Sequence, residues 1–404
     1  MKFLRLRLSG SAMHFAVLAA TLVALILSSF LLLSKTQNFF RLKNTSQIEA
    51  INNLFYQLPA YLEDSINAKS ENLIVNTRFW GGYFLNHAQA INGNSAFSKW
   101  ALSGQLLKNR PSLILQDNFI PLVVAGNSRI EGPVLLPDSG VKPGAINGIY
   151  YSGQTAVYGS INNTNSLGFP KLDPTWTAYA TKLLDYIPSS EDNSTINLTD
   201  LQHSFDAPTR YFYSPDPIEI TQNIAGNVSI ISNQSITIHA NATITDAQII
   251  APTITVASGF NGRLHAVARD SIIVDTNSRL SYPSSLVLVN QNTTGFFGKI
   301  NLNEQTVVNG NIIYVNNQEP ESISSNINIP DTAVVNGTIF CQGAVEVSGT
   351  VNGTVISHYT MVNARGQKFI NHVFGANLLS RNFPENVAGL PIANSPKTVA
   401  LWLY

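Results

Sequence analysis

The chain contains almost no cysteine and few charged residues. Cys341 is the single cysteine among 404 residues, so a framework of disulfides within the chain is excluded. Charged residues make up 12% of the chain, and 24 basic residues balance 24 acidic ones. The net charge therefore does not indicate nucleic acid or an acidic polymer as a partner. Cys341 follows Ile339 and Phe340, and this context predicts a small, buried apolar residue.

The sequence also lacks the common motifs of enzymes and cofactor-binding proteins. It contains no glycine-rich phosphate loop, no zinc-ligand spacing and no nucleophile elbow. No two histidines stand at the spacing of metal ligands, so we expect neither a metal nor a cofactor. The seven histidines are His14, His87, His203, His239, His265, His358 and His372.

A hydrophobic run near the N-terminus predicts a membrane span. Ala12 to Leu33 is an uncharged stretch of 22 residues, long enough to cross a bilayer as a helix. A cleaved signal peptide is the alternative, but its hydrophobic region is normally shorter, and no small-x-small cleavage site follows Leu33. Basic residues flank both ends; the short basic tail, residues 1–11, favours a cytoplasmic N-terminus, with the rest of the chain outside.

The composition suggests a compartment. Abundant Asn, Ser, Thr and Gly with few charges suit an extracytoplasmic β protein, and we predict a bacterial inner-membrane protein with a periplasmic C-terminal domain. The alternative is a eukaryotic type II membrane glycoprotein, since ten Asn-x-Ser/Thr sequons occur. The sequons begin at Asn44, Asn162, Asn193, Asn197, Asn227, Asn233, Asn241, Asn292, Asn336 and Asn352.

The segment after the span, residues 34–71, is predicted to form a helical stalk or linker. Its apolar residues recur at helical spacing with polar residues between them. These apolar residues are Ile48, Ile51, Leu54, Phe55, Leu58 and Leu62.

A repeated pattern in the last third of the chain predicts a β-solenoid. Val308-Asn309-Gly310, Val335-Asn336-Gly337 and Val351-Asn352-Gly353 each precede a short β-forming run, and they start 27 and then 16 residues apart. Asn-Gly is typical of a corner between short strands, and recurrence without an intervening helix is typical of solenoid coils. We therefore predict a mainly β protein with a β-solenoid over residues 218–362. The alternative is an antiparallel β-sandwich.

The remaining segments are assigned around this predicted solenoid. Residues 72–164 alternate short strands with Gly or Asn-Gly turns and are predicted to form a β domain and the first coils. Residues 165–217 interrupt the pattern and are predicted to be an insertion, with an amphipathic helix from Pro174 to Ile187. Residues 363–404 lose the repeat and are predicted to cap the open strand edge at the end of the solenoid.

One cluster of charged residues has the composition of a carbohydrate-active site. Arg263, His265, Arg269, Asp270 and Asp275 combine carboxylates for acid–base chemistry with cations that would neutralise a sugar acid. Arg269-Asp270 equally suits a solvated corner between strands, and no set of acidic residues recurs from coil to coil. We therefore predict that the protein is not an enzyme, and these residues remain the candidates if it is one.

Aromatic residues offer a second kind of candidate site. They could stack on sugars or contact a protein partner, although packing in the core or cap explains most of them. They are Trp80, Tyr83, Phe84, Trp100, Tyr150, Tyr151, Tyr158, Tyr211, Phe212 and Tyr213.

The runs Val335–Ile339 and Val347–Val355 resemble the repeat of bactofilins, the "polymer-forming" β-helical scaffolds of bacteria. The resemblance covers residues 305–362 and implies a scaffold that assembles end to end. A basic tail, one span and a Gly-rich β region with Tyr282-Pro283-Ser284 also resemble uncharacterised single-span envelope proteins. Minor-pilin-like subunits are loosely similar, since their membrane helix continues into a stalk.

From these features we predict a membrane-anchored periplasmic scaffold or assembly subunit, as in a pilus-like or secretion apparatus. Its expected partners are the lipid bilayer, through Ala12–Leu33, other envelope proteins and further copies of itself. The alternative is a carbohydrate-binding or polysaccharide-degrading β-helix protein.

Overall fold

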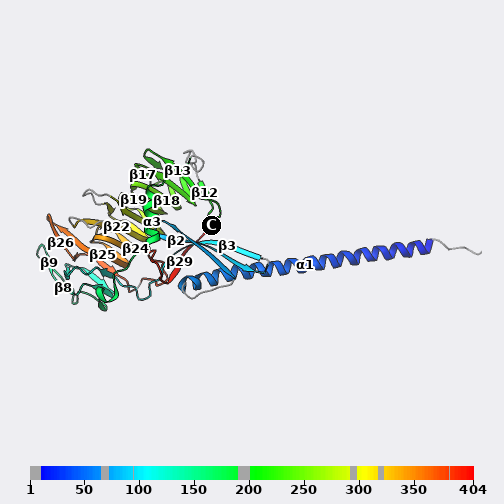
Figure 1. Ribbon diagram of the computed structural model, residues 1–404, viewed down its shortest axis with the longest axis horizontal. Coiled ribbons are helices and arrows are strands. Elements are labelled where there is room, and N and C mark those ends of the chain that lie inside the picture. Colours follow the sequence, from blue (N-terminus) through cyan, green and yellow to red (C-terminus); the bar gives the residue numbers. More distant parts are fainter. Residues whose placement is uncertain are drawn as a thin grey trace, which may run out of the picture. The chain divides into compact units, whose positions relative to one another are not determined.

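The computed structural model describes residues 11–64, 72–93, 95–189, 201–291, 298–316, 323–381 and 383–404. Strands hold 51% of the described residues and helices 18%, which confirms a mainly β protein with a long N-terminal helix (Figure 1). The chain divides into two compact units. Among the described residues, the first unit contains 11–57, 72–74, 89–93 and 95–98, and the second contains the others.

Helix α1 (Ser11–Glu63) runs for 53 residues without a break, through both the predicted span and the predicted stalk. It is long and apolar enough to cross a membrane, and its apolar part is unburied. A narrow stripe of residues four apart is buried further along: Ala50, Leu54, Leu58 and Leu62. Ile48 and Phe55 were expected on this stripe but are 57% and 36% exposed, and the stripe begins at Ala50, which was not among the expected residues.

Helix α1 forms polar contacts with other residues in each of the two units. In the first unit, the Ser46 hydroxyl donates to the Asn92 carbonyl at 2.8 Å, and the Asn92 amide donates to Glu49 Oε2 at 2.6 Å. In the second unit, Glu63 forms an exposed ion pair of 2.5 Å with Lys108.

A four-stranded sheet combines strands from opposite ends of the chain, in the order β1-β2-β3-β29. The last strand pairs antiparallel with β3, with Trp402 opposite Ala101. The residues predicted as a terminal cap, 363–404, thus supply the edge of a sheet that begins directly after α1. The bounds are β1 (Leu73–Trp80), β2 (Tyr83–Asn92), β3 (Ser95–Gln105) and β29 (Lys397–Leu403).

The largest sheet closes on itself, and from β12 to β25 many strands pair with a strand one or a few places further along the chain. Among the described residues, the pairings whose register is known are parallel except for β25 with β26, so the antiparallel β-sandwich is not formed. Its strands are β4 (Leu113–Leu115), β6 (Arg129–Glu131), β7 (Val134–Leu136), β11 (Ile161–Asn163), β12 (Leu201–His203), β13 (Arg210–Ser214), β14 (Ile218–Ile220), β15 (Asn223–Gly226), β16 (Val228–Ser232), β17 (Ser235–Ile238), β18 (Thr243–Val256), β19 (Asn261–Val274), β20 (Arg279–Asn290), β21 (Lys299–Leu302), β22 (Val307–Asn316), β23 (Ser325–Ile329), β24 (Val334–Val347), β25 (Thr350–Ala364), β26 (Gln367–Ile370) and β28 (Asn377–Leu379).

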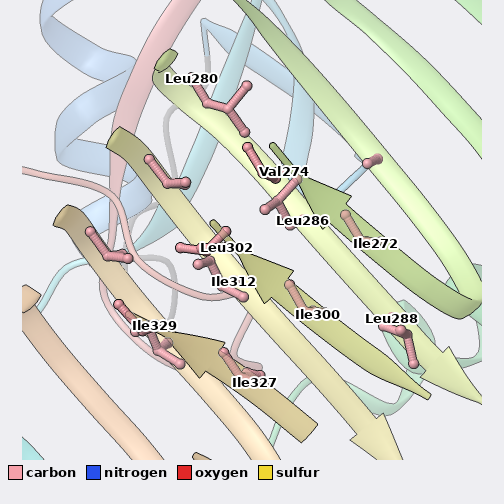
Figure 2. Packing of buried hydrophobic residues seen from close by; sticks show 14 of the residues in the cluster. Ile272, Val274, Leu280, Leu286, Leu288, Ile300, Leu302, Ile312, Ile327 and Ile329 are labelled. Atoms are coloured by element: carbon pink, nitrogen blue, oxygen red, sulfur yellow. The ribbon is translucent and has the colours of Figure 1, made fainter. Parts of the chain in front are cut away.

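The parallel register stacks like residues on like residues. Leu286 of β20 lies beside Ile312 of β22, which lies beside Ile339 of β24. Because side chains alternate along a strand, one set fills the interior of the closed sheet. Figure 2 shows part of this interior, where residues such as Ile272, Ile300 and Ile327 point into one apolar layer. Cys341 is buried in the same core, as predicted.

The spatial order of the strands differs from their order in the chain. Beyond β25 the sheet continues with β28 and with β4, then with β6 and β7, and finally with β11. The edge at β25 is therefore covered both by β28, from the predicted cap, and by strands from residues 113–163, which were not expected there. An unpaired parallel edge needs partners, but local periodicity does not specify which strands supply them.

Helix α3 (Pro174–Leu184) confirms the predicted amphipathic helix, which Asp173 caps by accepting from the Thr175 amide at 2.8 Å. It packs on the outer face of the large sheet, with Trp176 and Ala180 buried. The residues predicted as an insertion, 165–217, thus do not all project from the sheet, since β12 and β13 already belong to it. The outer apolar row includes Ile231, Ile250, Val267, Val287, Ile313, Phe340 and Ile356.

Smaller elements complete the second unit. A three-stranded parallel sheet has the order β27-β5-β8, and a two-stranded antiparallel sheet pairs β9 with β10. Their bounds are β5 (Leu122–Ala125), β8 (Val141–Pro143), β27 (His372–Phe374), β9 (Ala145–Ile146) and β10 (Ile149–Tyr150). Helix α2 (Thr164–Leu167) is a single turn.

Candidate functional site

The predicted charged cluster is spread along β19 and the turn after it. Arg263 forms two hydrogen bonds with the Asp246 carboxylate, Nε to Oδ1 at 2.5 Å and Nη2 to Oδ2 at 2.7 Å. Such a forked, partly buried pair is a strong charge-assisted interaction. Asp246 has a positive φ of 64° at an irregularity between β18 and β19 and was not singled out from the sequence.

His265 is fully buried next to this pair. Its Nδ1 lies 2.9 Å from the Ser285 hydroxyl, and its ring meets the edge of Tyr83 at 5.9 Å between centroids. Burial, and then the charge of Arg263, lower the pKa of His265 to about 3. The imidazole is therefore neutral near pH 7, and its Nε2 has no hydrogen-bond partner. These features suit a packed histidine better than a proton donor.

The other candidates lie further along the chain. Arg269 is 3.9 Å from carboxylate oxygens of both Asp185 and Asp270. Asp275 accepts hydrogen bonds from the Thr276 amide at 2.8 Å and from Asn303 at 3.0 Å, and these bonds lower its pKa. Arg269 and Asp270 lie within β19 and not in a corner between strands, and the structure does not gather the five predicted residues around one point.

A groove of about 530 Å³ lies beside Asp246 and Arg263. The end of β29, including Trp402, lines it opposite residues of β12, β15 and β18. Among the described lining residues, Asp246 is the one acidic side chain, and Arg263 already neutralises it. Acid–base cleavage of a sugar needs two carboxyl groups in distinct states, and this groove supplies one.

The Gly81-Gly82 turn between β1 and β2 forms hydrogen bonds with the large sheet and with α3. The Gly82 amide donates to the Ser285 hydroxyl at 2.9 Å, and Trp176 Nε1 donates to the Gly81 carbonyl at 2.9 Å. Trp80 Nε1 donates to the Asp246 carbonyl at 2.7 Å. At Gly81, with φ of 54°, a Cβ atom would lie 2.6 Å from the Cβ of His265. The sequence showed only two glycines between aromatic residues, without indicating their partners.

The predicted Asn-Gly corners form a ladder inside strands β22, β24 and β25. Asn336 Nδ2 donates to Asn309 Oδ1, and Asn352 Nδ2 donates to Asn336 Oδ1, both at 2.7 Å. The glycines beside them, Gly310, Gly337 and Gly353, have φ of 144°, 156° and 139°. The chain therefore bends here within a continuous parallel pairing, and the residues do not form hairpin turns.

Helix α1 presents the most extensive apolar surface on the described chain. Large apolar side chains are exposed along it from Met13 to Leu42, and again at Ile48 and Tyr56. Exposed apolar surface of this extent marks contact with lipid or with another protein.

The aromatic candidates divide into buried residues and residues on the surface. Trp80, Tyr83, Phe84 and Phe212 are buried, whereas Tyr150 is 76% exposed, and Tyr211 lines a groove beside α3.

No protein-family model, curated protein or solved structure matches this chain.

Proposed function

We propose that this chain is a single-pass inner-membrane protein whose C-terminal part lies in the periplasm and acts as a scaffold or assembly subunit through protein–protein contact. The observation that carries the proposal is α1, one helix with a long apolar part that is exposed and a later stripe that is buried. A helix of this kind connects a bilayer anchor to the rest of the chain.

The length of the exposed surface favours a protein partner in addition to lipid. Ala12–Leu33 spans about 33 Å at 1.5 Å per residue, which matches a hydrocarbon core of about 30 Å. On the same helix, Leu42 and Ile48 lie about 13 Å and 22 Å beyond Leu33. Their side chains are 68% and 57% exposed. Because lipid tails do not reach that far, contact with another helix would shield these residues from water.

We infer further that the large sheet is a β-solenoid. Parallel pairing along most of the large sheet, its closed interior and three stacked Val-Asn-Gly runs all support this assignment. A solenoid presents flat, regular faces on which partners can dock, and this suits an assembly role better than a transient one.

The burial and hydrogen bonding of several sequon asparagines support the bacterial compartment over the eukaryotic alternative. Asn227 is fully buried, and the Asn336 and Asn352 amides bond within the ladder, so none of the three is free to carry a glycan. Asn193, Asn197 and Asn292 lie outside the described residues.

The test is the size of the complex extracted from the membranes of the host that makes the protein. We expect the full-length protein, in mild detergent, to run above the mass of a monomer. Leu42→Asp with Ile48→Asp should reduce it to the monomer, since a charge in a helix–helix contact is costly to bury. Gln47→Asp adds a charge at an exposed polar neighbour and should leave the complex intact.

A second arm tests the orientation. Protease added to spheroplasts should degrade the C-terminal part, and protection of that part would reverse the topology. A wild-type protein that is monomeric in native extracts, or a double variant that assembles as well as Gln47→Asp, would contradict the assembly role.

A further inference from the structure

A groove of about 570 Å³ runs beside α3, within the size range of small-ligand sites. Tyr179, Lys182 and Tyr186 come from α3 and the residues after it, and Tyr211 comes from β13. Neither Asp246 nor Arg263 lines this groove, and the assembly role does not use it.

The aromatic rings of this groove are held in place. Tyr186 and Tyr211 lie 5.2 Å apart between centroids with their planes inclined by 54°. Tyr179 packs 5.5 Å from Phe79, and its hydroxyl accepts a hydrogen bond from Gln248 at 2.7 Å. Burial raises the pKa of both Tyr179 and Tyr211, so their hydroxyl groups remain protonated near pH 7. The groove therefore offers rigid ring faces together with polar hydroxyl groups.

Two cations accompany these rings. Lys182 is exposed in the last turn of α3, and the Arg78 guanidinium is close enough to Tyr179 and Tyr211 to interact with both electrostatically. Arg78 is held over the Trp100 ring at 4.5 Å. Among the described residues, neither cation has an acidic side chain within ion-pair distance, whereas the nearby Asp185 lies 3.9 Å from Arg269. The local balance of charge thus favours an anionic ligand.

We propose that this groove binds an acidic oligosaccharide, with a sugar ring on Tyr186 and Tyr211 and its carboxylate facing Lys182, while Arg78, which does not line the groove, adds positive charge near Tyr179 and Tyr211. A pyranose presents C–H patches that pack on aromatic faces, between hydroxyl groups that exchange hydrogen bonds with Tyr and Thr. Thr175 adds a further hydroxyl to the lining. Charged uronate groups are then recognised by charge-assisted contacts with the two cations.

The test uses the full-length protein in detergent and two ligands of similar size, a trimer of galacturonic acid and a trimer of galactose. Calorimetric titration should show the acidic trimer binding at least about tenfold more tightly than the neutral one. Tyr186→Ala should weaken binding of the acidic trimer about tenfold or more. Lys182→Ala should remove most of the preference for the acidic trimer while keeping the weaker binding of the neutral one.

Matched controls use the same residue types elsewhere on the surface. Tyr150→Ala and Lys142→Ala replace exposed side chains that do not line the groove, and they should leave the affinities for both trimers unchanged. The absence of binding by either trimer would overturn the proposal. So would acidic-trimer binding that survives Tyr186→Ala, or an acidic hexapeptide that competes as effectively as the sugar. These outcomes do not depend on whether the protein assembles through α1.

Discussion

The glycines beside the asparagine ladder permit a quantitative test of how closely the strands of the large sheet approach, centred on Gly337. A Cβ atom added there would lie 1.8 Å from the Gly310 carbonyl oxygen and 2.7 Å from its carbonyl carbon. Atoms do not approach that closely, so Gly337→Ala must push two paired strands apart. The obstacle is backbone, which cannot rotate away as a flexible side chain could.

The cost can be bounded by separating two effects. A positive φ in a non-glycine residue costs about 1 kcal/mol or somewhat more. Opening the ladder adds broken strand hydrogen bonds and poorer packing of the neighbouring circuits, at about 1 kcal/mol for each lost bond. We therefore expect Gly337→Ala to destabilise the protein by about 3 kcal/mol or more.

Gly366 provides the matched control, because its φ is 78° but a Cβ atom there would meet nothing within 4 Å. Gly366→Ala should cost only the conformational part, about 1 kcal/mol. The assay is urea unfolding of the full-length protein in detergent, followed by far-ultraviolet circular dichroism. If the two variants unfold at the same urea concentration, close approach at Gly337 does not limit stability, and the reasoning is refuted.

Two further predictions concern the ladder and the buried histidine. Asn336→Ala should cost about 1–2 kcal/mol of unfolding free energy, because Asn336 both donates to Asn309 and accepts from Asn352. Urea unfolding checks this, with Asn328→Ala, at a part-exposed asparagine, as the control. Equal losses of stability in the two variants would contradict the prediction. The pKa of His265 is about 3 in the folded protein against 6.5 ordinarily, so between these values the unfolded chain binds the additional proton. Stability should therefore fall as the pH is lowered from about 6.5 towards 3, and thermal melts of His265→Gln should show a smaller fall; identical pH profiles would contradict the assignment.

Sequence periodicity predicted the features that arise from local chemistry. Ala12–Leu33 forms part of one apolar helix, the form in which a long uncharged run satisfies its backbone hydrogen bonds within itself. The amphipathic pattern from Pro174 predicted α3 for a similarly local reason, and the structure adds that Asp173 caps its first turn. Recurrence of Val-Asn-Gly likewise indicated equivalent positions, which the register places side by side.

Only the tertiary structure decided which distant segments meet. β4 lies against β25, and β29 lies against β3, although hundreds of residues separate each pair in the chain. Arg263 pairs with Asp246, and Trp176 bonds to Gly81, through the same kind of long-range packing. A strand's pattern states which face is apolar but not which neighbour completes its hydrogen bonds. The sequence by itself therefore determined the helices and the repeating unit, whereas the order of the strands and the partners of its charged and aromatic residues depended on the folded chain.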